Sequence, residues 1–225
     1  MSWEVITIGG DDVLILLPSW AALDFATVLS SEFSRQFEAE GLHMSVGFAI
    51  GQSKMPVRLL RNAAYKALRS AKRRAYQTET GCIDFHNFVK EGHIPESLDA
   101  ARVKNRTAQA RHGDFKPAEF RERLYGRPYT LDEARALRGS LDILRSEKSP
   151  EDKFPRSQLY QMAAEMERGE VRGSLFYDYQ YARLKEKQRQ QLASIHSLWG
   201  GKEWPWLRRT GDPLHTVLLD LLDLL

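Results

Sequence analysis

The residues best suited to binding or catalysis are two glycines and two aspartates close to the start of the chain. Gly9 and Gly10 are followed by Asp11 and Asp12, with an apolar run on either side. Glycines permit positive φ and let a phosphate chain approach the backbone. Adjacent aspartates offer the hard oxygen ligands that Mg²⁺ prefers alongside substrate phosphates, and two such ions could activate a 3′-hydroxyl and stabilise a departing pyrophosphate. The four residues are a candidate metal and phosphate loop, although Gly and Asp are also common in solvated hairpin turns.

The segments around this loop predict how it is held. Residues 4–8 and 13–17 are apolar and separated by four turn-forming residues, which predicts a β-hairpin. Ser19 is a candidate cap for a helix that ends at Gly41, and a strand is expected over residues 42–50. A basic helix with a face of alanines begins at Pro56, and residues 82–85 form a closing strand.

Beyond residue 92 the pattern changes to helix. Thr130 and Glu133 have the spacing of a capping box at a helix start, and Leu214 opens an amphipathic last helix. Further helices are expected over residues 98–112, 118–125, 157–168 and 174–198. We therefore predict an α+β protein with two domains, an α/β domain over residues 1–92 and an all-helical bundle of about five helices over residues 93–225.

Composition narrows the class of protein. Hydrophobic residues make up 42% and charged residues 28% of the 225 residues, as in an ordinary globular protein. Cys82 is the only cysteine, which excludes an internal disulfide or a cysteine-rich zinc site and fits a reducing compartment. The N-terminal sequence lacks the features of a signal peptide, and the apolar runs are too short or too acidic to span a membrane. We expect a cytoplasmic protein that does not enter the membrane.

Two basic segments stand out against a net charge of only +3. Residues 54–74 hold eight basic residues and no acid, and residues 102–127 hold eight against three acids. The second segment is a candidate for contact with a nucleic-acid phosphate backbone, and solvated charge is the alternative for both. Aromatic residues in the second half favour core or interface positions over base stacking: Tyr177, Tyr179, Tyr181, Trp199, Trp204 and Trp206.

The order of elements after the loop resembles the palm of the polymerase-like large subunit of type III CRISPR effector complexes. The resemblance runs from about Ile6 to Phe85 and includes the motifs Val-Leu-Ile-Leu-Leu-Pro, Met-Ser-Val-Gly-Phe-Ala-Ile, Lys-Met-Pro-Val and Ala-Lys. Diguanylate cyclases, which carry a Gly-Gly-Asp/Glu-Glu-Phe loop, are similar more distantly. Val13 stands where that loop has its Glu-Phe continuation, which argues against a diguanylate cyclase.

The resemblance implies an activity and a set of site residues. In that family the palm is ferredoxin-like, with an antiparallel sheet and helices on one face, and it converts ATP into cyclic oligoadenylates when target RNA is bound. By position, Asp11 and Asp12 would be catalytic and would bind Mg²⁺ or Mn²⁺. Gly9, Gly10, Ser45 and Lys72 would contact the nucleotide. The implied partners are ATP, the other CRISPR effector subunits, and guide and target RNA, with a helical domain following the palm.

The resemblance also implies that a strand of the palm is missing from this chain. A complete palm of this family has an earlier strand that supplies another acidic metal ligand, whereas here the chain begins eight residues before Gly9. We expect either a C-terminal fragment or a chain completed by another polypeptide, and weak or no activity from the chain alone. The alternatives are a non-catalytic assembly or RNA-binding module of the same kind of complex, and a stand-alone nucleotide cyclase.

Overall fold

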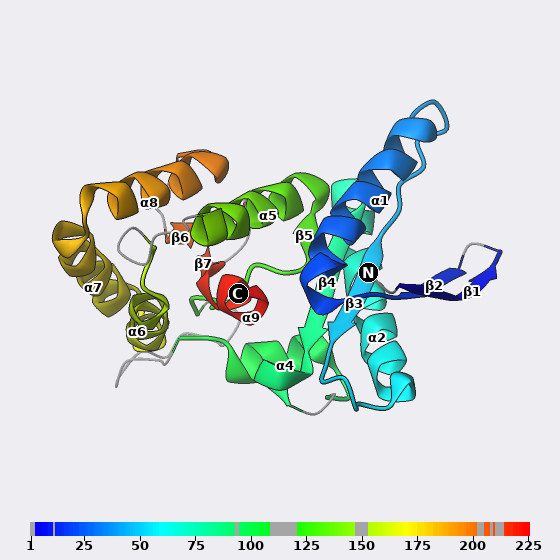
Figure 1. The fold of residues 1–225 in the computed structure, drawn as a ribbon, viewed down its shortest axis with the longest axis horizontal. Coiled ribbons are helices and arrows are strands. Elements are labelled where there is room, and N and C mark those ends of the chain that lie inside the picture. Colours follow the sequence, from blue (N-terminus) through cyan, green and yellow to red (C-terminus); the bar gives the residue numbers. More distant parts are fainter. Residues whose placement is uncertain are drawn as a thin grey trace. The chain divides into compact units, whose positions relative to one another are not determined.

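The computed structural model describes residues 3–10, 12–92, 95–108, 121–146, 153–201, 205–207, 209 and 214–225. The chain divides into two compact units, Met1–Ile94 and Pro95–Leu225 (Figure 1). Unit 1 contains β1 (Glu4–Gly9), β2 (Asp12–Leu16), η1 (Ser19–Ala21), α1 (Ala22–Gln36), β3 (Val46–Ile50), α2 (Val57–Thr78), β4 (Cys82–Asn87) and α3 (Phe88–Glu91). Unit 2 contains α4 (Leu98–Asn105), β5 (Tyr129–Thr130), α5 (Leu131–Ser146), α6 (Arg156–Met166), α7 (Glu170–Arg183), α8 (Glu186–Leu198), β6 (Trp206–Leu207), β7 (His215–Thr216) and α9 (Leu218–Leu224). In these described ranges, no helix combines the length and the apolar character needed to cross a membrane.

The first two strands form the predicted hairpin. β1 and β2 pair in antiparallel register from Glu4 opposite Leu16 to Gly9 opposite Asp12, with an irregularity between Val5 and Thr7. The β-branched and apolar residues on both sides of the Gly-containing turn explain why this segment folds back on itself. The four-residue spacing read from the sequence is therefore confirmed as a hairpin.

The rest of unit 1 is built on a strand–helix–strand unit. β3 and β4 are parallel, with Val46 opposite Ile83 and Ile50 opposite Asn87, and α2 packs on both strands. The helix can lie close because Ala63, Ala67 and Ala71 are fully buried on its inner face. Gly47 on β3 lies directly against the backbone of α2, where an added Cβ would collide with the Leu68 amide nitrogen. The alanine face predicted from the sequence is the face that meets the sheet.

One part of the predicted fold class is wrong. The sheet was expected to be antiparallel, but β3 and β4 run in the same direction. The reason is the connection between them: α2 carries the chain back along the sheet, so the next strand starts at the same end as β3. Within the described residues the β1–β2 hairpin forms its own two-stranded sheet, and β3 has a strand partner on one edge only.

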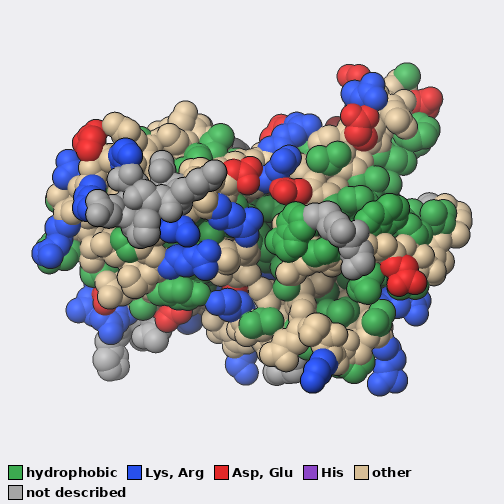
Figure 2. All heavy atoms as spheres, in the orientation of Figure 1, with side chains coloured by type: hydrophobic (Ala, Val, Ile, Leu, Met, Phe, Trp, Pro, Cys, Tyr) green, Lys and Arg blue, Asp and Glu red, His purple; other side chains and the backbone are tan. Residues whose placement is uncertain are grey.

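Much of the apolar surface of unit 1 is exposed. Figure 2 shows hydrophobic side chains gathered over the part of unit 1 formed by α1 and the hairpin. Ile8 in β1 is 73% exposed, and Trp3, Val13, Trp20 and Val28 are also exposed. Large contiguous apolar patches are uncommon on proteins that act alone and typically mark an interaction surface. Ile8 and Val13, which pair next to the turn, place part of this apolar surface beside the candidate loop.

Unit 2 is mainly helical. α5 packs on α8, α6 packs on α7, and α9 contacts both α5 and α6. The shared core consists of aliphatic and methionine side chains: Leu137, Leu141, Leu159, Met162, Met166, Leu192, Ile195, Leu218 and Leu221. The predicted capping box is confirmed, because the Thr130 amide donates to Glu133 Oε2 at 2.9 Å and the Glu133 amide donates to Thr130 Oγ1 at 3.4 Å.

Several predicted helix boundaries in unit 2, and a predicted cap in unit 1, are wrong. The single helix expected over residues 174–198 is two helices, because the buried Leu184 is extended, with φ −66° and ψ 147°, and α8 starts with its own cap at Lys185. Residues 121–125 are not helical, and residues 118–120 lie outside the described residues. The last helix begins at Leu218, because His215 and Thr216 form β7 and pair with β6. Unit 2 is therefore not all-helical as predicted.

The predicted cap in unit 1 is also wrong, because Ser19 makes no capping hydrogen bond to the first helical segment of unit 1.

Candidate metal and nucleotide loop

The Gly-Gly-Asp-Asp loop lies at the tip of the β1–β2 hairpin. Gly9 ends β1, and Asp12 begins β2 as its paired residue. Gly10 forms the turn with φ +59°, a conformation that glycine adopts without the steric cost that a Cβ would bring. Asp11 lies outside the described residues, so its role as metal ligand and catalytic residue stays a prediction.

The loop has free space around its backbone. A Cβ built on Gly9 or on Gly10 meets no heavy atom within 4 Å. Both glycines and Asp12 are exposed. A phosphate group could therefore approach the backbone of the turn without displacing a described side chain, as the glycines in the sequence suggest.

The chemistry of the loop suits a divalent cation. Mg²⁺ is commonly held by one or two carboxylates together with substrate phosphates and water, and the exposed Asp12 carboxylate is of this kind. Among the described residues, no group of three or more His, Cys, Asp and Glu side chains is arranged to hold a metal ion. That search does not include Asp11. The fit of a cation here therefore rests on the ligand types and on the open turn.

Ser45 lies at the start of the parallel strand pair. Its Oγ accepts a hydrogen bond from the backbone nitrogen of Cys82 at 3.4 Å, which links the beginnings of β3 and β4. The side chain is half-buried. This contact accounts for a polar residue at this position, and the contact with nucleotide that the resemblance implies stays a prediction.

Lys72 is exposed on α2, on the side of the helix that faces away from β3 and β4. Because α2 runs back toward the start of β4, Lys72 and Ser45 belong to the same end of the strand–helix–strand unit. In the part of the chain that is described, no hydrogen bond or ion pair joins the hairpin tip to Ser45 or Lys72. The structure therefore pairs Gly9 with Asp12, and it does not connect the loop with the other two predicted nucleotide residues.

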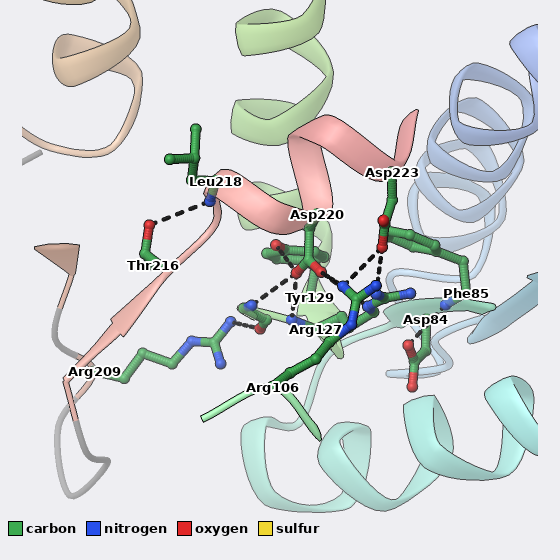
Figure 3. A network of polar contacts seen from close by, with 11 residues as sticks. Asp84, Phe85, Arg106, Arg127, Tyr129, Arg209, Thr216, Leu218, Asp220 and Asp223 are labelled. Atoms are coloured by element: carbon green, nitrogen blue, oxygen red, sulfur yellow. Dashed lines mark hydrogen bonds and ion pairs between the residues drawn. The ribbon is translucent and has the colours of Figure 1, made fainter. Parts of the chain in front are cut away.

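The described residues of unit 2 include a buried cluster of polar side chains that was not anticipated from the sequence. Asp220 of α9 accepts hydrogen bonds from the Gly126 amide at 2.7 Å, from Arg127 Nε at 3.0 Å and from the Tyr129 hydroxyl at 2.6 Å. Asp223, one turn later, lies 2.8 Å from Arg127 Nη2 and 2.8 Å from Arg106 Nη1 (Figure 3). Two arginines and two aspartates thus balance their charges inside the unit.

Burial corrects the interpretation of the second basic segment for three of its eight basic residues. Arg102 and Arg127 are buried, and the Arg106 side chain is only 13% exposed. These three arginines cannot track an RNA backbone, because their guanidinium groups are directed into the unit. Residues 109–120 of the same segment lie outside the described residues. The only signal in the sequence was the Asp220 and Asp223 pair, which interrupts an otherwise apolar last helix.

Burial changes the acid–base behaviour of this cluster. Burial raises the pKa of the Asp223 carboxyl above its ordinary value, and the attraction of Arg127 and Arg106 opposes that rise. Burial also raises the pKa of the Tyr129 phenol well above its ordinary value, and the neighbouring Asp220 charge acts in the same direction. Tyr129 therefore remains a hydrogen-bond donor to Asp220 across the physiological pH range. The cluster is a structural element that joins α9 to the segment before α5.

The predicted positions of the aromatic residues in unit 2 are correct only in part. Trp206 is buried, and the Trp199 indole donates from Nε1 to Ser140 Oγ at 3.1 Å, which joins the end of α8 to α5. Tyr179 and Tyr181, in contrast, are exposed on α7. Trp204 lies outside the described residues. The interpretation as core or interface anchors therefore holds for Trp199 and Trp206, and Tyr179 and Tyr181 are not core residues.

Comparison with known proteins identifies a family that part of the chain resembles. No curated protein matches the chain. Residues 2–79 match the family described as "Cas10/Cmr2, second palm domain". The matching segment contains the hairpin with its loop, α1, β3 and all of α2, and it does not extend into unit 2. Residues 2–79 are thus similar to the palm found in the large subunit of type III CRISPR effector complexes.

Proposed function

We propose that the chain supplies the palm of a large subunit in a type III CRISPR effector complex, and that its loop binds ATP and metal for cyclic oligoadenylate synthesis. The observation that carries this proposal is the Gly-Gly-Asp-Asp loop at an exposed hairpin tip, within the segment that matches this palm. The ferredoxin-like arrangement of the palm and a cytoplasmic location belong to the same proposal.

Each site residue has a distinct part in this proposal. Asp11 and Asp12 hold Mg²⁺ or Mn²⁺, and the bound ion supplies activation of a 3′-hydroxyl and neutralisation of phosphate charge. Gly9 and Gly10 leave room for the phosphates, in keeping with the open space around both residues. Lys72 provides a cation for the triphosphate and Ser45 borders the nucleotide. Guide and target RNA act through the assembled complex.

The same proposal requires that the palm be completed. Within the described residues β3 has an unpaired edge, and the hairpin forms a separate sheet with exposed apolar side chains. A strand from another polypeptide, or from another segment of a longer one, would pair with the open edge and cover this surface. We therefore propose that the chain is catalytically competent only when such a strand is present.

The test is synthesis by the assembled complex. The chain is combined with its neighbouring subunits, guide RNA, target RNA, labelled ATP and Mg²⁺ or Mn²⁺, and the products are separated by chromatography and identified by mass. Replacing both carboxylates, Asp11→Ala with Asp12→Ala, is expected to abolish cyclic oligoadenylates. Unchanged synthesis by this variant would overturn the catalytic assignment.

A matched control removes two exposed acids from elsewhere in unit 1, with Glu38→Ala and Glu40→Ala. This control is expected to retain synthesis. The second candidate function is a non-catalytic assembly module, which the exposed apolar hairpin favours. In that case the complex would form, as measured by size-exclusion chromatography, but wild-type chain would make no product under any metal condition.

A further inference from the structure

The outer face of α2 carries a line of cations and tyrosines. Arg58, Arg61, Tyr65, Arg69, Lys72 and Tyr76 are all exposed, and they recur at intervals of three or four residues. This spacing places them in one row along the helix, on the side opposite the buried alanines. We call these six residues the α2 ridge.

The charge of the α2 ridge is not neutralised within the protein. The sequence has no acidic residue between Glu40 and Glu79. In the described residues, Arg58, Arg61, Arg69 and Lys72 form no ion pair. Some exposed arginines on other helices do form ion pairs, since Arg35 pairs with Glu32 and Arg135 pairs with Asp132, each at 2.8 Å. A row of cations without acidic partners attracts an extended anion.

The two tyrosines add a second kind of contact. Tyr65 is 57% exposed and Tyr76 is 92% exposed, so both rings are accessible from solvent. The Arg69 guanidinium lies 6.0 Å from the centre of the Tyr65 ring, which places a cation beside an aromatic surface. Aromatic rings between phosphate-binding cations are the combination that proteins use to stack bases of single-stranded nucleic acids without regard to sequence.

The ridge is also held rigidly and is long enough for such a ligand. Its six residues span 18 helical intervals, or about 27 Å at ~1.5 Å per residue. The inner face of α2 is fixed by the buried Ala63, Ala67 and Ala71 and by the close approach of Gly47. The helix is therefore an ordered platform before any ligand binds, which lowers the entropic penalty of binding.

From these observations we infer that the α2 ridge binds single-stranded nucleic acid, with phosphates on the arginines and bases stacked on Tyr65 and Tyr76. A membrane surface fits less well, because the apolar face of α2 is occupied by the sheet and cannot insert into lipid. An acidic polypeptide would use the cations but would leave the tyrosines without a stacking partner. The test of this inference does not depend on oligoadenylate synthesis, because its variants leave Lys72, the residue proposed for the triphosphate, unchanged.

Binding is measured with the full chain by fluorescence anisotropy, using labelled single-stranded RNA and single-stranded DNA of uniform sequence at several salt concentrations. The charge variant replaces three ridge arginines: Arg58→Gln, Arg61→Gln and Arg69→Gln. Each phosphate contact contributes about −0.7 to the slope of log affinity against log salt for single strands. The variant is expected to bind more weakly and to reduce the magnitude of the slope by about 2. Comparing RNA with DNA shows which of the two is preferred.

The matched charge control removes three arginines outside the ridge, the exposed Arg35 and Arg135 and the half-buried Arg138: Arg35→Gln, Arg135→Gln and Arg138→Gln. It changes the net charge by the same amount and is expected to bind like the wild type. Equal loss of affinity in the ridge variant and in this control would overturn the inference, because general charge would then explain binding. Failure of the wild-type chain to bind either single strand at low salt would also overturn it.

The stacking contact has its own test. Tyr65→Leu and Tyr76→Leu are each expected to weaken binding by roughly 5-fold to 150-fold, while the Phe variants retain binding because stacking is preserved. Tyr179 is the matched control, since Arg183 lies over its ring in the same way at 5.1 Å on the exposed side of α7. Tyr179→Leu is expected to leave binding unchanged. Competition by polyglutamate or by phosphatidylserine vesicles as strong as that by a single strand would contradict a nucleic-acid ligand.

Discussion

Tyr129 donates its phenolic hydrogen to Asp220 across 2.6 Å, although 91 residues of sequence separate the two. Both side chains are fully buried. The same carboxylate accepts bonds from the Gly126 and Arg127 amides and from the Arg127 guanidinium. This single residue of α9 thus organises the segment that leads into α5.

Asp220→Asn is expected to lower the free energy of unfolding by about 3–5 kcal/mol, because two buried arginines then face a single carboxylate. Urea unfolding followed by circular dichroism measures the change. Asp132→Asn, at an exposed pair with Arg135, is the control and is expected to change stability by no more than about 0.5 kcal/mol. If Asp220→Asn does not fold, Tyr129→Phe removes one donor and is expected to cost about 1.5–3 kcal/mol. Wild-type stability in both variants would contradict the structural role of the cluster.

The raised pKa of Asp223 predicts a pH dependence of stability. Burial raises the pKa in the folded state above its ordinary value of 3.8, so folding favours the protonated carboxyl. This contribution is fully present below the ordinary value and is lost as the pH rises through the folded-state pKa. Wild-type protein is therefore expected to lose stability relative to Asp223→Asn as the pH rises above 3.8. Unfolding curves measured over this range test the sign, and a constant or opposite difference would refute it.

Three glycines of unit 1 are expected to respond differently to alanine. Gly47→Ala introduces a Cβ into the backbone of α2 and is expected to destabilise the protein by about 1–3 kcal/mol. Gly10→Ala strains a residue at φ +59° and is expected to cost about 1–2 kcal/mol. Gly9→Ala meets nothing within 4 Å and serves as the control for stability. Thermal unfolding ranks the three variants by their loss of stability. A loss in Gly9→Ala as large as that in Gly47→Ala would contradict the close packing of Gly47 against α2.

The capping box of α5 predicts that two of its variants lose stability to different extents. Thr130→Ala removes the side-chain acceptor at the helix start and is expected to cost about 1 kcal/mol. Glu133→Ala is expected to cost more, because Glu133 Oε1 also accepts from Arg209 Nε at 2.7 Å. Thermal unfolding compares both with Ser194→Ala, an exposed residue of α8 whose change should be small. A smaller effect for Glu133→Ala than for Thr130→Ala would show that the Arg209 contact adds nothing.

The features that depend on neighbouring residues could be predicted from the sequence. The β1–β2 hairpin, the alanine face of α2 and the Thr130–Glu133 capping box all follow from spacings of a few residues. The break at Leu184 could not be predicted, because Leu184 fits a continuous helix as well as a turn. What ends the helix is an extended backbone that buries the Leu184 side chain in unit 2.

The sequence by itself determined the loop of Gly9, Gly10, Asp11 and Asp12, because these residues are consecutive between two apolar runs. It also determined the row of cations and tyrosines on one side of α2, because that row follows from helical periodicity. Only the tertiary structure decided that the α2 ridge is exposed and that Arg102, Arg106 and Arg127 are directed inward. Burial of an arginine depends on whether a distant segment supplies a carboxylate, as Asp220 and Asp223 do here. No spacing of basic residues within their own segment carries that information, because the carboxylates that pair with Arg106 and Arg127 lie more than 90 residues away.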